Sequence, residues 1–95
     1  MDRPMPSEPT WPAWWDRELE LSAHVLRRMV DRDFSEVDLR RMLDEATGLR
    51  PDIEAGRWIV ATRHLDRRWE VILEPDESVG VVLVVTAYPV STSQP

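Results

Sequence analysis

Two pairs of side chains in this sequence could do chemistry, one near the start of a predicted helix and one near the end of a predicted strand. His24 lies within a turn of the helix start, where free backbone N–H groups favour a phosphate. Arg28 follows on the same helix face, so the pair could hold one anion. Thr86 and Tyr88 project to one side of a strand and could donate hydroxyl protons. The alternative is that His24 and Arg28 only line a solvated helix face.

Other polar residues are weaker candidates. We expect His64 to pack against Trp69 at a strand end and Arg63 to pair with Glu70, so neither side chain is free for catalysis. The sequence has two histidines and no cysteine, so no thiolate metal site can form. We therefore predict no metal and no small-molecule cofactor.

The charge of the chain is unevenly distributed. All twelve basic residues are arginine, and eighteen acids bring the net charge to −6. Residues 21–68 hold ten arginines against nine acids, so the acidic excess belongs to the two ends. Nucleic-acid-binding proteins normally show a basic surface, which counts against this function, although the central arginines weaken the objection.

Length and hydropathy indicate one small domain that lies outside the membrane. The chain has 95 residues, near the lower limit for a core without disulfides or metals. Its longest apolar run, Val79 to Val90, is too short to span a bilayer and is typical of a strand buried on both faces. The polar, proline-rich start does not resemble a signal peptide, so we expect a soluble cytoplasmic protein.

We divide the chain into a leader over 1–18, a domain over 19–90 and a disordered tail over 91–95. The leader holds three of the five tryptophans, at positions 11, 14 and 15. These side chains either fold back to cover the small core or dock on a partner protein.

Two helices and several strands are predicted to position the candidate side chains. Ser22 is a suitable N-cap for a helix over 23–32, with Ala23, Leu26, Met29 and Val30 on its buried side. Ser35 and Asp38 form a capping box for a helix over 36–46, which Gly48 would end.

A short edge strand is expected over 18–21 and longer strands over 57–65, 68–74 and 80–88. A turn at Asp66–Arg67 places Arg63 opposite Glu70. The last strand is expected to pair on both edges, with Leu83 and Val85 buried. The fold class is therefore α+β: a two-helix hairpin packed on one face of a curled, mainly antiparallel sheet of three to four strands.

Several short motifs in this order resemble one family. They read S-x-H-x-x-x-R-M-x-x-R-x-F-S-x-x-x-L from residue 22, then G-R-W-I-V, W-E-V-I-L-E-P-D and V-V-T-A-Y-P-V. Over residues 19–90 the pattern is similar to the domain of unknown function 4258 family, which is related to the RelE/ParE and BrnT toxins. The resemblance implies a RelE-like fold and a bacterial, metal-independent endoribonuclease of a toxin–antitoxin system.

The resemblance maps a catalytic site onto His24, Arg28, Thr86 and Tyr88, and implies RNA and a cognate antitoxin as partners. The absence of lysine, the acidic charge and the tryptophan-rich leader depart from the toxin pattern. Two other classes therefore stay open: a non-catalytic interaction module that docks a partner through the tryptophan segment, and an inert structural remnant of a toxin fold. A homodimer is also open.

Overall fold

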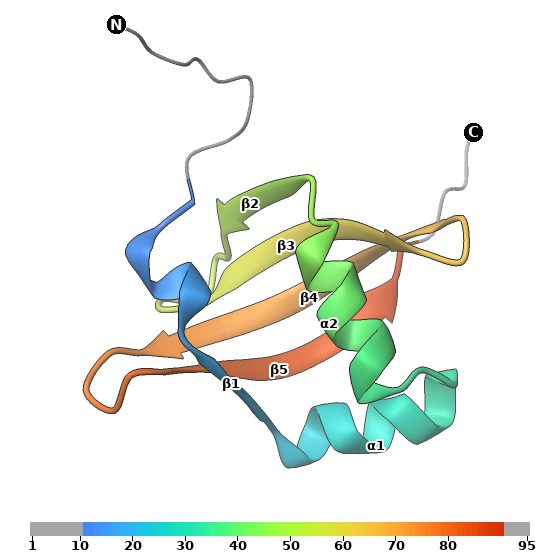
Figure 1. Cartoon of the computed structure of the whole chain (residues 1–95), viewed down its shortest axis with the longest axis horizontal. Helices are drawn as coiled ribbons and strands as arrows, with labels where there is room; N and C mark the ends of the chain where they lie inside the picture. The colour runs from blue at the N-terminus through green and yellow to red at the C-terminus, as the bar shows by residue number, and fades with distance from the viewer. Residues whose placement is uncertain (1–10, 91–95) are drawn as a thin grey trace, which may run out of the picture.

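A computed structural model describes residues 11–90 of the chain. Two α-helices and a five-stranded sheet follow a short 3-10 helix (Figure 1). Along the chain the elements are η1 (Ala13–Asp16), β1 (Glu18–Leu21), α1 (Ala23–Arg32), α2 (Glu36–Asp44), β2 (Gly48–Pro51), β3 (Trp58–His64), β4 (Arg67–Asp76) and β5 (Val81–Pro89). The predicted tail over 91–95 and the first ten residues of the leader lie outside the described residues.

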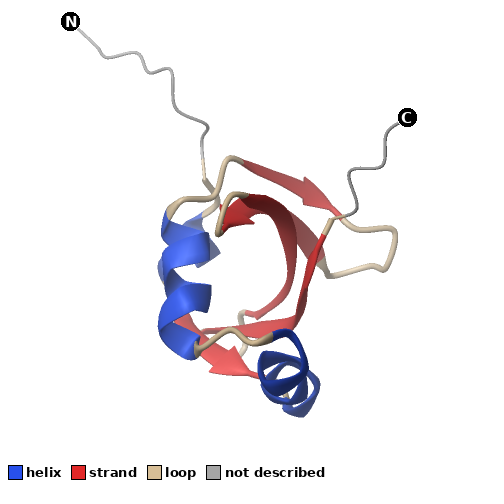
Figure 2. Cartoon of the chain, turned by 90° about the vertical axis from the view of Figure 1, so that its right-hand side faces the viewer, coloured by secondary structure: helices blue, strands red, loops and turns tan. Residues whose placement is uncertain are grey.

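The sheet is mixed and open, with the strand order β1-β5-β4-β3-β2. β1 pairs parallel with β5, and the other neighbours are antiparallel. The sheet curls, and both helices lie on its concave side (Figure 2). The α+β class, the two helices on one face and the double pairing of β5 are confirmed. The expected three to four strands are too few, because residues 48–51, for which no strand is predicted, form the additional strand β2.

Sequence-local signals fix the helix boundaries. The Ser22 hydroxyl accepts a hydrogen bond from the backbone N–H of Val25, and Ser35 and Asp38 form the predicted capping box. α1 covers the predicted residues 23–32. α2 ends at Asp44, two residues early, and Gly48 begins β2 instead of capping the helix.

The rotation of α1 differs from the prediction. Val25 is fully buried and Met29 packs on the core, whereas Leu26 and Val30 are 49% and 82% exposed. The cause is the position of α1 at the sheet edge. The Ser22 hydroxyl donates to the carbonyl of Val85, and the Arg32 guanidinium donates to that of Ala87. These bonds satisfy the edge of β5 beyond the end of β1 and set which side of α1 faces the sheet.

The β3–β4 register is displaced by two residues from the prediction. Arg63 lies opposite Arg68, and Ala61 lies opposite Glu70. Leu65 and Asp66 form the turn, and both have positive φ angles, of 53° and 65°. This matches a two-residue turn of type I′, which a Leu-Asp pair does not signal in sequence. A displacement of two leaves the same side chains together on each face of the hairpin, because side chains alternate with a period of two.

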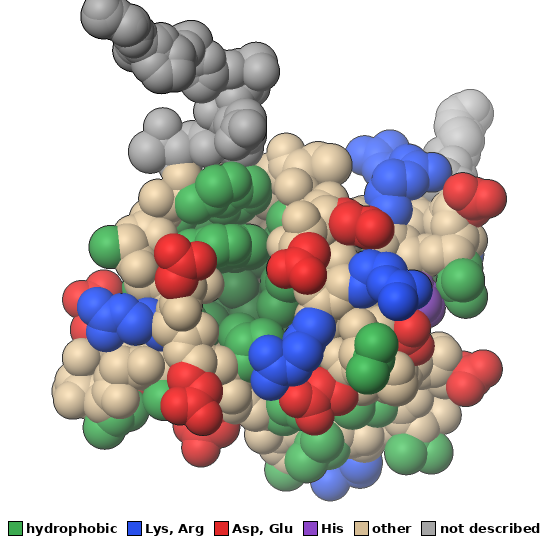
Figure 3. Space-filling view, viewed as in Figure 1, with side chains coloured by type: hydrophobic (Ala, Val, Ile, Leu, Met, Phe, Trp, Pro, Cys, Tyr) green, Lys and Arg blue, Asp and Glu red, His purple; other side chains and the backbone are tan. Residues whose placement is uncertain are grey.

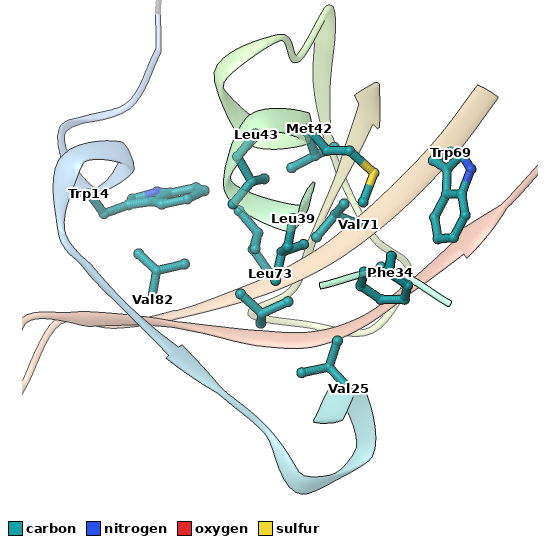
Figure 4. Packing of buried hydrophobic residues seen from close by; sticks show 13 residues of the cluster. Trp14, Val25, Phe34, Leu39, Met42, Leu43, Trp69, Val71, Leu73 and Val82 are labelled. Atoms are coloured by element: carbon teal, nitrogen blue, oxygen red, sulfur yellow. The ribbon is translucent and has the colours of Figure 1, made fainter. Parts of the chain in front are cut away.

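The core fills the concave side of the sheet (Figure 4). From β5 it receives Val82, Val84 and Ala87, which are at most 1% exposed. Leu83 and Val85, predicted to be buried, are half-buried on the opposite face. Because side chains alternate along a strand, only one of the two sets of β5 side chains can face the core. The prediction that Leu83 and Val85 belong to this set is wrong. No helix within residues 11–90 is long and apolar enough to cross a membrane.

Candidate functional site

The structure does not join the four predicted site residues by hydrogen bonds within residues 11–90. His24 is exposed in the first turn of α1. Arg28 forms an ion pair with Asp31, with its Nη1 atom 2.7 Å from the carboxylate. The Tyr88 hydroxyl donates to Glu70. In this arrangement His24 and Arg28 therefore do not form a joint site with Tyr88.

His24 and Tyr88 lie near opposite ends of α1. Ser22, two residues before His24, binds the carbonyls of Val84 and Val85. Tyr88 instead follows Ala87, whose carbonyl accepts from Arg32 at the last residue of the helix. Eight helical residues separate His24 from Arg32, a rise of about 12 Å.

Tyr88 belongs to a polar cluster on the convex side of the sheet. Its hydroxyl oxygen is 2.7 Å from Oε1 of Glu70, and Nη2 of Arg50 is 3.0 Å from Oε2 of the same carboxylate. Partial burial tends to raise the pKa of Glu70, but the bonds from Tyr88 and Arg50 outweigh it and lower this pKa. Burial, and then the bond to Glu70, raise the pKa of Tyr88 from 10.0 to about 12. At neutral pH the cluster therefore holds a carboxylate, a phenol and a guanidinium.

We expect the Tyr88 phenol to titrate near pH 12, because partial burial disfavours the phenolate and ionisation also places a second negative charge beside Glu70. Tyr88 is the only tyrosine, so the absorbance of its phenolate reports this group alone. The folded-state pKa exceeds the unfolded one, so the stabilisation is complete below about pH 10 and is lost as the pH rises through about 12. Glu70→Gln should move the midpoint back towards 10, and an unchanged midpoint would contradict the coupling.

The other predicted contacts divide. His64 packs edge-on against Trp69, with ring centroids 5.4 Å apart, as predicted. Arg63 does not pair with Glu70, because the two-residue displacement separates them and Arg50 from β2 takes the place. Arg63 instead donates to the carbonyl of Asp66 at 3.4 Å.

A pocket of about 180 Å³ opens on the concave side, between η1, β1 and α2. Figure 3 shows apolar side chains at the bottom of this hollow and charged side chains around it. The apolar lining consists of Trp15, Leu19, Leu43, Leu73 and Val82. The rim carries two acids and two bases: Asp16, Arg17, Arg40 and Asp44.

The tryptophan segment builds one wall of this pocket. Trp14 is 7% exposed and belongs to the core, with its ring 5.7 Å from that of Trp58. Trp15 faces the pocket and stacks on Trp11 at 4.6 Å. Residues 11–18, assigned to the leader, therefore pack on the domain, and Trp14 fits the interpretation that the segment covers the core.

Sequence reasoning did not identify the pocket. Trp15 was singled out, but its partners come from β1, α2, β4 and β5, and no local pattern brings these elements together. Among residues 11–90 no three histidine, aspartate or glutamate side chains gather as metal ligands. Comparisons with protein-family models, curated proteins and solved structures find no match to this chain.

Proposed function

We propose that this protein is a non-catalytic interaction module whose pocket, between η1, β1 and α2, takes an apolar side chain of a partner protein. The observation that carries the proposal is the pocket itself: an apolar floor, a tryptophan wall and a rim with both charge signs. At protein interfaces, the residues that dominate binding are often aromatic and lie in an apolar centre surrounded by a polar rim. The separation of His24 from Tyr88 also favours a module over an enzyme.

The size of the pocket decides the class of ligand. Pockets for drug-sized ligands and cofactors have volumes of about 300–1,000 Å³. An apolar cavity of about 150 Å³ admits one benzene-sized group. At about 180 Å³ the pocket suits one large apolar side chain, with the rim charges meeting the flanking residues of the partner segment.

The RelE/ParE-like fold belongs to this proposal. A strand followed by two helices and a mostly antiparallel sheet supports it, since the toxin group consists of small proteins with a sheet and two helices. On this assignment the partner segment would come from a cognate antitoxin or another regulatory protein, and the location would be cytoplasmic.

The test is selection from a displayed library of random peptides on the full chain. We expect enrichment of peptides with one large apolar residue, and Trp15→Ala should weaken their binding about thirtyfold, the effect of losing an interface hot spot. Trp11→Ala is the matched control, because Trp11 stacks on Trp15 without lining the pocket. If the affinity of the selected peptides did not change with Trp15→Ala, or if the peptides did not shift the NMR signals of Leu43 and Trp15, the peptides would bind outside the pocket.

The rim offers a second matched pair on α2. Arg40 lines the pocket and Arg41 does not, although they are adjacent and both exposed. Arg40→Glu should change the charge preference of the selected peptides and reduce affinity a few-fold, as rim charges do. Arg41→Glu should leave both unchanged.

Metal-independent RNA cleavage is the second candidate, and the cluster at Tyr88 favours it. Such cleavage needs a base for the 2′-hydroxyl, a proton donor and fixed cations. Glu70, Tyr88 and Arg50 supply these groups within hydrogen-bond distance of one another. The lowered pKa of Glu70 makes it a weak base and the raised pKa of Tyr88 a weak acid, which ranks this function below the module.

Cleavage of bulk and ribosome-bound RNA, measured with a chelator present, tests the second candidate. An active enzyme should lose its rate with Tyr88→Phe, and His24→Ala shows whether the helix residue predicted from the family resemblance contributes. The full chain and a chain without residues 1–10 should both be assayed, because Trp14 and Trp15 must stay. If neither chain cuts either RNA, this candidate is abandoned.

A further inference from the structure

The convex face of the sheet, which we call the outer face, has an apolar centre that no helix covers within residues 11–90. Both helices pack on the concave side (Figures 1 and 2). Across the three central strands the outer face presents Ile59, Ala61, Ile72, Leu83, Val85 and Thr86. Ile72 is only 7% exposed, whereas the other five are half-buried. Such a face on a small domain is a candidate interface.

One end of the outer face is acidic and hollowed. A depression of about 320 Å³ lies where β4 turns into β5, with Val81 and Leu83 among its lining residues. Its other lining residues are Glu20, Glu74, Pro75, Asp76 and Glu77. Within the described residues Arg57 pairs with Glu74 at 3.1 Å, which leaves the depression with an excess of negative charge.

The opposite end of the outer face is basic. Arg63 and Arg68 lie side by side across β3 and β4, next to the hairpin turn. Two like charges directly opposite each other in an antiparallel pair are unfavourable unless an anion lies near. The charge of Arg68 helps to lower the pKa of the Glu70 carboxylate. Both oxygens of that carboxylate, however, already accept hydrogen bonds, from Tyr88 and from Arg50.

We propose that the outer face is the interface of a homodimer in which the arginine end of each copy meets the acidic depression of the other. A two-fold axis lying across the strands reverses their direction and brings opposite ends together, as an isologous interface requires. Ile72 lies four residues after Arg68 and five before Glu77 on β4 and the following turn, so it falls near the axis. Ile72 is already covered within its own chain, so the contact at the axis would come from the half-buried side chains around it, Ile59, Ala61 and Val85.

Charge complementarity selects a second copy over another partner. A single acidic or basic protein would match one end of the face and oppose the other. A copy of this chain matches both at once, and it presents an equally apolar centre. The proposal does not depend on the pocket, which opens on the concave side.

The expected dimer is weak. Curvature limits contact to β3, β4 and β5, a patch of roughly 15 Å by 25 Å from strand spacing and rise. Two copies would then bury about 800 Å², below the roughly 1,200–2,000 Å² of stable protein interfaces and within the range of weak, transient ones. The dissociation constant should therefore be micromolar or weaker, and salt should raise it, because the arginine–carboxylate contacts lie at the rim.

Sedimentation velocity of the full chain, from micromolar to millimolar concentration, tests the proposal with two charge reversals. Arg68→Glu or Glu77→Arg should each raise the dissociation constant about tenfold or more, because symmetry turns two attractive contacts into two repulsive ones. An equal mixture of the two variants should recover a heterodimer of about wild-type affinity, since each reversed charge then meets its opposite. A folding defect could not produce this recovery.

Arg67→Glu is the matched control. Arg67 precedes Arg68 on β4 and points to the other face of the sheet, because side chains alternate along a strand. It should leave the dissociation constant unchanged. A wild-type chain that stays monomeric at millimolar concentration, a mixture that does not associate, or an Arg67→Glu variant as weak as Arg68→Glu would each overturn the proposal.

The dimer and RNA cleavage at Tyr88 exclude each other, because Tyr88 and Glu70 project from the outer face that the second copy covers. Cleavage, if present, should therefore fall as the protein concentration passes the dissociation constant of the dimer. Cleavage per chain that does not change through that range would count against the interface.

Discussion

Replacing Trp14 by alanine is expected to remove about half of the stability of the protein. Trp14 is 7% exposed and belongs to the same core cluster as Leu43 and Val82 (Figure 4), so its truncation leaves a large cavity at one end of the core. Truncating a buried tryptophan costs about 3–5 kcal/mol, and a domain of this size has a total stability of roughly 5–10 kcal/mol. Urea unfolding, followed by circular dichroism, should show a much lower midpoint with an unchanged slope.

Trp15→Ala is the control from the same short helix. Trp15 is half-buried and lines the pocket, so its loss should cost about 1 kcal/mol through reduced apolar burial. The same substitution should abolish most peptide binding. If Trp14→Ala were as mild as Trp15→Ala, the tryptophan segment would not be part of the core.

Local sequence signals predicted most of the helices and strands, because capping residues and apolar patterns lie within each element itself. The serine caps predicted the starts of α1 and α2, apolar alternation predicted β3 and β4, and the continuous apolar run predicted β5. On β3 and β4 the same side chains share a face even though the register is displaced by two, since an even displacement preserves the faces.

The failures concern interactions between elements distant in sequence. The rotation of α1 depends on bonds from Ser22 and Arg32 to carbonyls of β5, which no helical pattern reveals. β2 is only four residues long and ends in Pro51, so it carries no alternation to detect. The inward set on β5 depends on a bulge opposite Ile72 and Leu73, and both sets on that strand are apolar.

The candidate sites show the same division. Tyr88 lies on the last strand, as predicted, but the prediction paired Glu70 with Arg63 and placed no strand at Arg50. The cluster exists because β2 lies beside β3 and brings Arg50 within 3.0 Å of Glu70. The pocket likewise needs η1 to lie near α2, which depends on Trp14 entering the core.

Leu73→Ala is the second substitution for which we expect a large loss of stability. Leu73 is 1% exposed at the centre of the core (Figure 4) and also contributes to the floor of the pocket. Its truncation should cost about 2–5 kcal/mol, from lost transfer energy and the cavity left behind. Leu83→Ala removes the same atoms from the outer face of the neighbouring strand, and should cost about 1 kcal/mol because Leu83 is only half-buried.

Adding a small aromatic molecule distinguishes a cavity joined to the pocket from general loosening of the core. Leu73→Ala enlarges an apolar space that already measures about 180 Å³, so benzene or toluene should bind there and raise the melting temperature of the variant. The increase should exceed that of the wild-type chain, and Leu83→Ala should gain nothing beyond wild type, because it opens no internal space. Equal increases in all three proteins would show that Leu73 does not form the pocket floor. A Leu83→Ala variant less stable than Leu73→Ala would reverse the assignment of the two sheet faces.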